Sequence, residues 1–167
     1  MDERQQLEQA VINTFMSYVS FLIRSYNAQR GTNFKIIEHR AKPDFLIQDE
    51  KTGEKMGLDA LHLYYEGKEA QMRLGWHSNE LDGVTNGDFL IRKLNSGLAE
   101  KIDQATKYGF DGRMWLIVRV ASPIFDWRHF EIFKSDILFP MPNPFEKIWL
   151  LFSAKSTKPY CDLIQIV

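Results

Sequence analysis

Two aspartates of this chain, Asp44 and Asp59, are spaced so that a β-hairpin would bring their side chains together. Each borders or lies within an apolar run, and a charged segment with a glycine separates the two runs. Folding back near residues 51–52 places Asp44 opposite Asp59 or Ala60, within reach for cross-strand contacts. Two carboxylates so close repel each other unless a positive charge lies between them, and a divalent cation with oxygen ligands is the usual solution. The spacing therefore predicts a metal site.

Neither aspartate is diagnostic by itself. Asp44 follows a proline, and Pro-Asp is a common way to begin a turn, so Asp44 alone is compatible with a structural role. Asp59 is harder to explain in that way, because aspartate is disfavoured in an apolar strand and costly to bury without a partner. An α/β protein in which Asp44 is a turn residue and Asp59 pairs with a lysine remains an alternative.

The elements that must position these residues follow from the apolar periodicity. The pattern predicts helices at about 2–30, 88–108 and 125–136, and strands at about 34–38, 45–47, 56–65, 114–118, 148–152 and 162–167. The glycine-rich stretch before the second helix gives no clear pattern, its last part (81–87) is predicted to be a loop, and Asp88 is the expected helix cap. This order predicts an α/β/α sandwich around a mixed central sheet.

The composition is that of a globular protein of ordinary domain size, and we expect a single domain over residues 1–167. Of the 167 residues, 44% are hydrophobic and 26% are charged. No apolar stretch approaches the roughly 20 residues that span a bilayer, so no membrane partner is expected. The polar, acidic start does not resemble a secretory signal, and the one cysteine excludes an internal disulfide. These features predict a cytoplasmic location.

The charges are unevenly distributed although the net charge is only -1. Residues 24–42 carry five basic side chains against one acidic, and residues 43–66 carry six acidic against two basic. A basic segment beside an acidic pocket suits a site that holds a phosphate backbone and a metal together. The segment predicts nucleic-acid contacts through Arg24, Arg30, Arg40 and Lys42, although ordinary solvated faces would explain the charges equally well.

In its order of elements and in its acidic residues, the chain resembles the PD-(D/E)XK nuclease superfamily, which has the restriction-endonuclease-like fold. The core of that fold is a helix, a three-stranded meander, a helix and a strand. The motif of the superfamily begins with Pro-Asp, here Pro43 and Asp44. It continues on the third strand with an acidic residue, a spacer and a lysine, and this chain has Asp59, Ala60 and Leu61 there.

Leu61 is the departure from the family pattern, because the lysine that would orient a water or stabilise developing charge is missing. Some members of the superfamily carry a replacement on the following helix, where Lys101 and Lys107 are the candidates. A glutamine followed four residues later by tyrosine marks one branch of the family, and Gln104 and Tyr108 fit that spacing. Tyr108 also lies on the apolar face of its helix, which favours a core role.

The resemblance implies metal-assisted hydrolysis of phosphodiester bonds, in DNA rather than RNA. It implies Mg²⁺ or Mn²⁺ bound by Asp44, Asp59 and the carbonyl of Ala60. Glu38, or Glu8 on the first helix, would complete the coordination or act as base, and Lys101 or Gln104 would contact the phosphate. A homodimer is compatible with this family. The alternative is a catalytically silent member that serves as a nucleic-acid-binding or assembly module, and Leu61 is the residue that favours it.

Overall fold

Helix α1 (Glu3–Arg30) begins and ends where the sequence predicts, because both ends are flanked by residues suited to capping. The computed structural model describes residues 2–64, 83–121, 127–153 and 160–167. Asp2 and Gln5 form a reciprocal capping box, in which each side chain accepts a hydrogen bond from the other residue's backbone N–H. Gly31 closes the helix in the left-handed conformation, at a φ of 66°.

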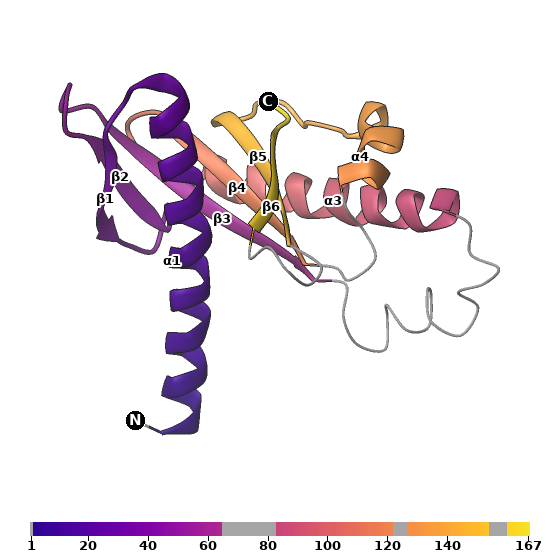
Figure 1. Ribbon diagram of the computed structural model, residues 1–167, viewed down its shortest axis with the longest axis horizontal. Helices are drawn as coiled ribbons and strands as arrows, with labels where there is room; N and C mark the ends of the chain where they lie inside the picture. The colour runs from indigo at the N-terminus through magenta and orange to yellow at the C-terminus, as the bar shows by residue number, and fades with distance from the viewer. Residues whose placement is uncertain (1, 65–82, 122–126, 154–159) are drawn as a thin grey trace.

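The remaining elements form one mixed sheet with helices on both sides (Figure 1). They are β1 (Phe34–His39), β2 (Phe45–Asp49), β3 (Lys55–Tyr64), α3 (Gly83–Thr106), β4 (Met114–Ala121), α4 (Trp127–Phe133), the 3₁₀ helix η2 (Lys134–Asp136), β5 (Phe145–Ser153) and β6 (Tyr160–Gln165). The six described strands lie in sequence order across the sheet. Strands β1, β2 and β3 form an antiparallel meander, β3, β4 and β5 are parallel, and β6 is antiparallel to β5. The predicted α/β class is confirmed.

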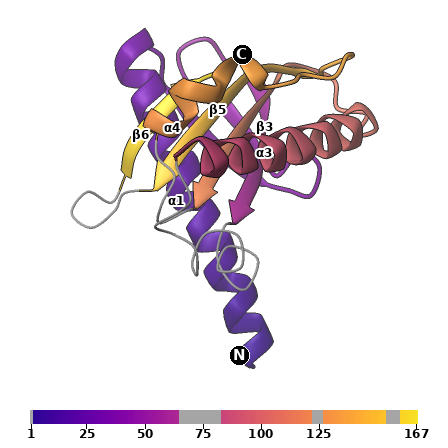
Figure 2. The same cartoon turned by 90° about the vertical axis from the view of Figure 1, so that its right-hand side faces the viewer.

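Alternation along the central strands gives the sheet two buried faces, as the continuous apolar runs predict. On one face Trp115 and Trp149 pack against α1, and the ring centroids of Trp115 and Tyr26 are 4.6 Å apart. On the other face Leu116 and Leu150 pack with the apolar side of α3. Figure 2 shows α1 and α3 on opposite sides of the sheet. A side chain on β3 or β4 therefore faces either α1 or α3, according to its position in the alternation.

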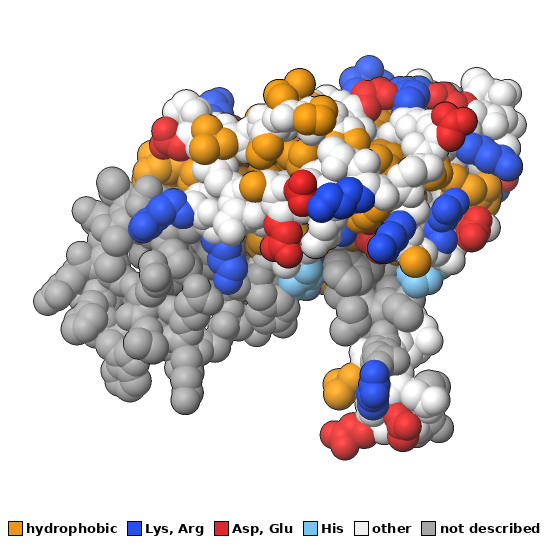
Figure 3. Space-filling model, turned by 180° about the vertical axis from the view of Figure 1, so that it is seen from behind, with side chains coloured by type: hydrophobic (Ala, Val, Ile, Leu, Met, Phe, Trp, Pro, Cys, Tyr) orange, Lys and Arg blue, Asp and Glu red, His pale blue; other side chains and the backbone are white. Residues whose placement is uncertain are grey.

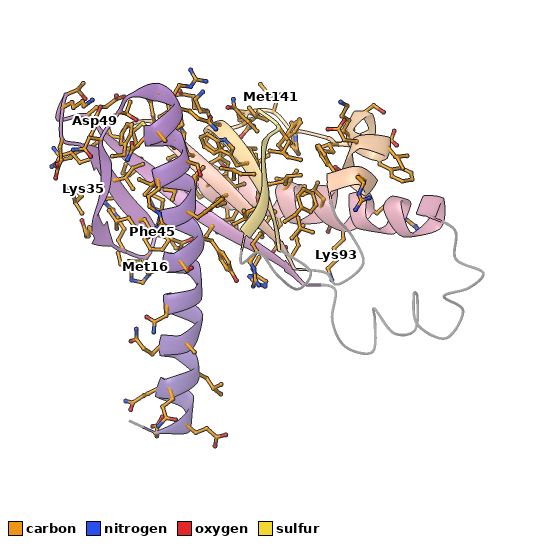
Figure 4. The ribbon with its side chains drawn as sticks, viewed as in Figure 1. Met16, Lys35, Phe45, Asp49, Lys93 and Met141 are labelled. Carbon is orange, nitrogen blue, oxygen red and sulfur yellow. The ribbon has the colours of Figure 1, made fainter. Side chains whose placement is uncertain are left out.

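The turn between β2 and β3 sets the register that brings the two predicted site residues together. Asp49, at the end of β2, is buried, and its carboxylate accepts hydrogen bonds from the backbone N–H groups of Asn33 and Lys51. Burial opposes ionisation of this carboxyl, but the two N–H donors hold its pKa below the usual value. Phe45 then pairs with Leu58, and Figure 4 shows Phe45 at the far end of the hairpin from Asp49. Asp44 and Asp59 flank the pair of Phe45 and Leu58 and lie opposite each other.

The structure corrects the predicted start of the second long helix. Helix α3 begins at Gly83, so residues 83–87 are helical and Asp88 lies inside the helix instead of capping it. A glycine costs only about 1 kcal/mol in a helix, and the burial of Ile91, Leu94 and Leu98 against the sheet outweighs the low propensity of the first turn. The helix ends at Thr106, two residues before the predicted end, and Gly109 follows at a φ of 62°.

Other boundaries differ from the prediction by a few residues at most. The stretch at 66–82, most of which gave no clear pattern, and the first two residues of the helix predicted at 125–136 lie outside the described residues. Strand β6 begins two residues earlier than predicted and ends two residues earlier. Within the ranges that the structure describes, no helix combines the length and the apolarity needed to cross a membrane.

Gly57 on β3 provides the first test, because its missing side chain makes room for the residue before Asp44. A Cβ at Gly57 would lie 2.6 Å from the ring carbon Cγ of Pro43, and a proline ring cannot rotate away. We expect Gly57→Ala to displace Pro43 and to destabilise the protein by about 1–3 kcal/mol, measured by chemical denaturation.

Gly97→Ala is the matched control for that substitution. Its Cβ would meet the flexible ends of two leucine side chains, Leu63 at 3.0 Å and Leu61 at 3.3 Å, and alanine favours the helix. Equal destabilisation by the two substitutions would contradict the role given to Gly57.

Candidate functional site

The two aspartates hold each other through backbone and side-chain hydrogen bonds at the start of the hairpin. Asp44 stands immediately before β2, and its backbone N–H donates to Oδ1 of Asp59 at 3.1 Å. The N–H of Ala60 donates to Oδ2 of Asp44 at 3.0 Å. The predicted juxtaposition of the two residues is confirmed. Ala60 contacts Asp44 through its N–H group, whereas the prediction assigned its carbonyl oxygen to a metal.

Asp59 is fully buried on the α3 face of the sheet and is neutralised by a lysine from that helix. Its exposed fraction is 0%, and Nζ of Lys101 lies 3.1 Å from its Oδ2. The Lys101 side chain is itself only 15% exposed. The hydroxyl of Tyr108 donates to the same oxygen at 2.7 Å. Of the two replacement lysines that the sequence offers, Lys101 is the one that contacts Asp59, whereas Lys107 is exposed and pairs with Asp103.

The pKa values of the two carboxyl groups shift in opposite directions, because the groups are buried and contact each other. The pKa of Asp44 rises to about 7, first because the group is desolvated, then because it hydrogen-bonds to Asp59 and feels the negative charge there. Burial also opposes ionisation of Asp59, but the hydrogen bond from Asp44, the Lys101 ammonium and the Tyr108 hydroxyl together lower its pKa. At neutral pH, Asp59 carries the charge, and Asp44 is close to half protonated.

Tyr108 has both the core role that its position favours and a polar role in the site. Its ring packs against the core between the sheet and α3, while its hydroxyl reaches Asp59. Burial, this hydrogen bond and the nearby negative charges raise the pKa of Tyr108, so it remains a hydrogen-bond donor. The spacing of Gln104 and Tyr108 was the sequence signal for it. Although Tyr108 follows the last residue of α3, Thr106, it reaches the same oxygen of Asp59 as Lys101 does.

Two of the predicted site residues, Gln104 and Glu38, are exposed to solvent and do not contact Asp44 or Asp59. Gln104 is exposed, and its amide donates to Glu100 at 3.4 Å instead of to either aspartate. Glu38 is exposed on β1, an edge strand, opposite Leu46. Within the described residues, neither side chain contacts Asp44 or Asp59. The direction of a side chain depends on its position around a helix or along a strand, and both of these positions face solvent. The predicted roles of Gln104 and Glu38 therefore lack geometric support, and the side chain of Glu8 lies outside the described part.

The four predicted nucleic-acid contacts divide between two parts of the molecule. Arg40 and Lys42 are exposed in the segment leading to Asp44, and the N–H of Arg40 donates to the carbonyl of Asp44 at 2.7 Å. The Arg40 guanidinium also lies 5.7 Å from the ring centroid of Phe110.

Arg24 and Arg30, the other two predicted contacts, are exposed on α1, which covers the face of the sheet opposite α3. Figure 3 shows the molecule from behind, on the side opposite α1, with acidic and basic side chains interspersed there. Only Arg40 and Lys42 are therefore placed beside the carboxylates.

The site has the donors for a hydrated divalent cation but not for a closed protein cage. Among the described residues, no three His, Cys, Asp or Glu side chains gather as metal ligands. Mg²⁺ commonly binds through one or two carboxylates and keeps several waters, which Asp44 and Asp59 could satisfy. Oδ2 of Asp59 already accepts from Lys101 and Tyr108, so direct ligation there requires Lys101 to withdraw.

Comparisons of the chain with protein-family models, with curated proteins and with solved structures found no significant match. Its function must therefore be inferred from the site itself.

The shared proton predicts an unusual titration for Asp44. We expect its carboxyl carbon, followed by ¹³C NMR in metal-free buffer, to titrate near pH 7. Asp59→Asn should move that midpoint toward the ordinary value near 4, because it removes the neighbouring negative charge. Asp103→Asn, at an exposed position on α3, is the control and should change nothing. A wild-type midpoint near 4 would show that the two carboxyl groups are not coupled.

The raised pKa of Asp44 also makes the stability of the protein depend on pH. The folded state holds the Asp44 proton more tightly than the unfolded chain does, so ionisation of this group favours unfolding. Its contribution to the free energy of unfolding is fully present below about pH 4 and is lost as the pH rises to about 7. Urea denaturation of wild type and Asp44→Asn between pH 4 and 8 isolates the effect. We expect the wild type to lose stability relative to the variant across this range, and parallel curves would refute this.

Proposed function

We propose that this chain is a metal-dependent nuclease that hydrolyses DNA phosphodiester bonds. Its active site would consist of Asp44, Asp59 and Lys101. The observation that carries the proposal is the contact of Lys101 with Asp59, because α3 thereby supplies the lysine that Leu61 does not. The order of elements from α1 to β4 supports a restriction-endonuclease-like core, since it is the helix, meander, helix and strand expected for that fold. Arg40 and Lys42 lie on the segment that leads into the site and suit a phosphate backbone.

The roles of the side chains follow from their contacts. Mg²⁺ or Mn²⁺, when bound, supplies a water of lowered pKa and neutralises charge on the phosphate. Asp44 must lose its proton before it can act as a ligand. Tyr108 holds Asp59 by donating to Oδ2, and the N–H of Ala60 holds Asp44. Lys101, once released from Asp59, has the length and charge to contact the phosphate oxygens.

A second candidate function is the catalytically silent nucleic-acid-binding or assembly module. The complete burial of Asp59 favours it, because the Lys101 ammonium already neutralises this carboxylate where a metal would otherwise be needed. If this chain is such a module, Asp44, Asp59 and Lys101 form an ion-pair cluster with a structural role. DNA binding through Arg40 and Lys42 would persist, without a metal requirement and with strong salt dependence.

We also propose a cellular location, a substrate and an oligomeric state for the protein. We place the protein in the cytoplasm and take DNA as its substrate. A homodimer would present one carboxylate pair to each strand of a duplex, which is a reason to measure the oligomeric state alongside the activity.

The first test of the metal site is thermal melting with Mn²⁺ or Mg²⁺. A ligand that binds only the folded state raises the melting temperature by mass action. We expect millimolar Mn²⁺ to raise the melting temperature of the wild type, more strongly at pH 8 than at pH 6 because Asp44 must be ionised. Asp44→Ala and Asp59→Ala should each abolish the rise. Absence of a rise in the wild type at either pH would favour the silent module.

The second test concerns catalysis by Lys101. We expect Lys101→Ala to lower the rate of Mn²⁺-dependent DNA cleavage by about 100-fold or more, the usual cost of losing a group that stabilises transition-state charge. Lys107→Ala removes the same charge from an exposed position just after the same helix and serves as the control. Similar rates for Lys101→Ala and wild type, with both folded, would exclude Lys101 from the chemistry.

A further inference from the structure

A second polar cluster lies on the face of the sheet opposite the two aspartates. His62 on β3 and Arg119 on β4 are register partners, near the carboxyl ends of these parallel strands. Arg119 follows Ile117 in the alternation of β4, and Ile117 packs in the core against α1. The Arg119 guanidinium lies over the ring of Tyr18 from α1, with Cζ 4.3 Å from the ring centroid. The cluster is therefore separate from the carboxylates, which meet α3.

The hydrogen bonding of Arg119 is incomplete. Its Nη1 lies 3.2 Å from Nε2 and 3.4 Å from Nδ1 of His62. Its Nε is buried and, among the residues that the structure describes, has no hydrogen-bond partner. In the part of the chain that the structure describes, no carboxylate pairs with Arg119. Arg113, at the other end of β4, has the ordinary arrangement, because Glu54 and Glu146 both bind its guanidinium.

A half-buried guanidinium without a counter-charge is energetically unfavourable. An unpaired buried charge loses its hydration, and an unsatisfied buried N–H group is costly. The contact with Tyr18 offsets part of this cost but gives the Nε–H group no acceptor. His62 supplies no negative charge. Burial and then the charge of Arg119 lower the pKa of His62 to about 4, so the imidazole is neutral at pH 7.

We propose that Arg119 binds an oxyanion, the carboxylate or phosphate group of a small ligand, at the carboxyl ends of β3 and β4. Such a group can accept from Nε and one Nη together, the paired geometry in which arginine binds carboxylates and phosphates most strongly. The ligand would supply the missing charge and satisfy the orphan N–H. The carboxyl ends of parallel strands are also where open α/β sheets ordinarily bind ligands. This site does not depend on the proposed nuclease activity.

An NMR titration tests the proposal and identifies the anion. Sodium phosphate and sodium acetate are added separately to the wild type, with sodium chloride at matched ionic strength as reference. We expect the Arg119 Nε–H resonance to shift saturably with at least one of the two. The pKa of His62 should rise when that anion is saturating, because the charge of Arg119 is then compensated. Saturation by phosphate alone indicates a phosphate-bearing ligand, and saturation by acetate indicates a carboxylate.

Variants of Arg119 test whether its guanidinium causes the response to the anion. Arg119→Gln should abolish saturation, and Arg119→Lys, which keeps the charge but not the paired donors, should weaken binding by about tenfold. Lys134→Gln makes the same charge change at an exposed position on η2 and should bind as the wild type does.

Two results would overturn the proposal. One is a shift that only follows ionic strength for both anions in the wild type, a measurement that stands even if Arg119→Gln fails to fold. The other is unchanged anion affinity in Arg119→Lys.

Discussion

The structure depends most on the neutralisation of one buried negative charge. Asp59 lies on a strand that is covered on both faces, with no exposure to solvent. An isolated carboxylate there would be very costly, and Lys101 on α3 and Tyr108 just after α3 offset that cost. Asp44 completes the arrangement, because its raised pKa keeps it partly protonated beside the ionised Asp59. This polar cluster thus links the sheet, the hairpin and the end of α3 within a largely apolar core.

The distribution of charge among Asp44, Asp59 and Lys101 is compatible with both proposed functions. A cluster in which a lysine already neutralises a carboxylate is stable without metal, which suits a silent module. A carboxyl group whose pKa is near 7 can also exchange its proton for a cation under ordinary conditions, which suits a metal-dependent enzyme. What separates the two is the free energy of moving Lys101 away from Asp59. On the opposite face Arg119 presents the converse case, a half-buried positive charge with no carboxylate partner among the described residues.

Local signals in the sequence predicted most of the elements, because capping residues, turn residues and apolar periodicity act over short distances. Asp2 and Gly31 bound the first helix as expected, and the buried strands follow their apolar runs. The start of α3 was mispredicted, because packing on the sheet overrode the weak propensity of its glycine-containing first turn. Gln104 was assigned to the site by spacing alone, but its direction around the helix places it in solvent.

The sequence by itself determined the hairpin and limited the partner of Asp44 to Asp59 or Ala60, because the turn between the two apolar runs has a restricted length; the observed register selects Asp59. It narrowed the replacement lysine to two positions on one helix. Only the tertiary structure decided that Lys101 and not Lys107 reaches Asp59, because the rotation of α3 on the sheet is set by packing of its whole apolar face. It alone also brought Tyr18, His62 and Arg119 together. These three residues come from a helix and two strands far apart in the chain, and no local spacing encodes their contact.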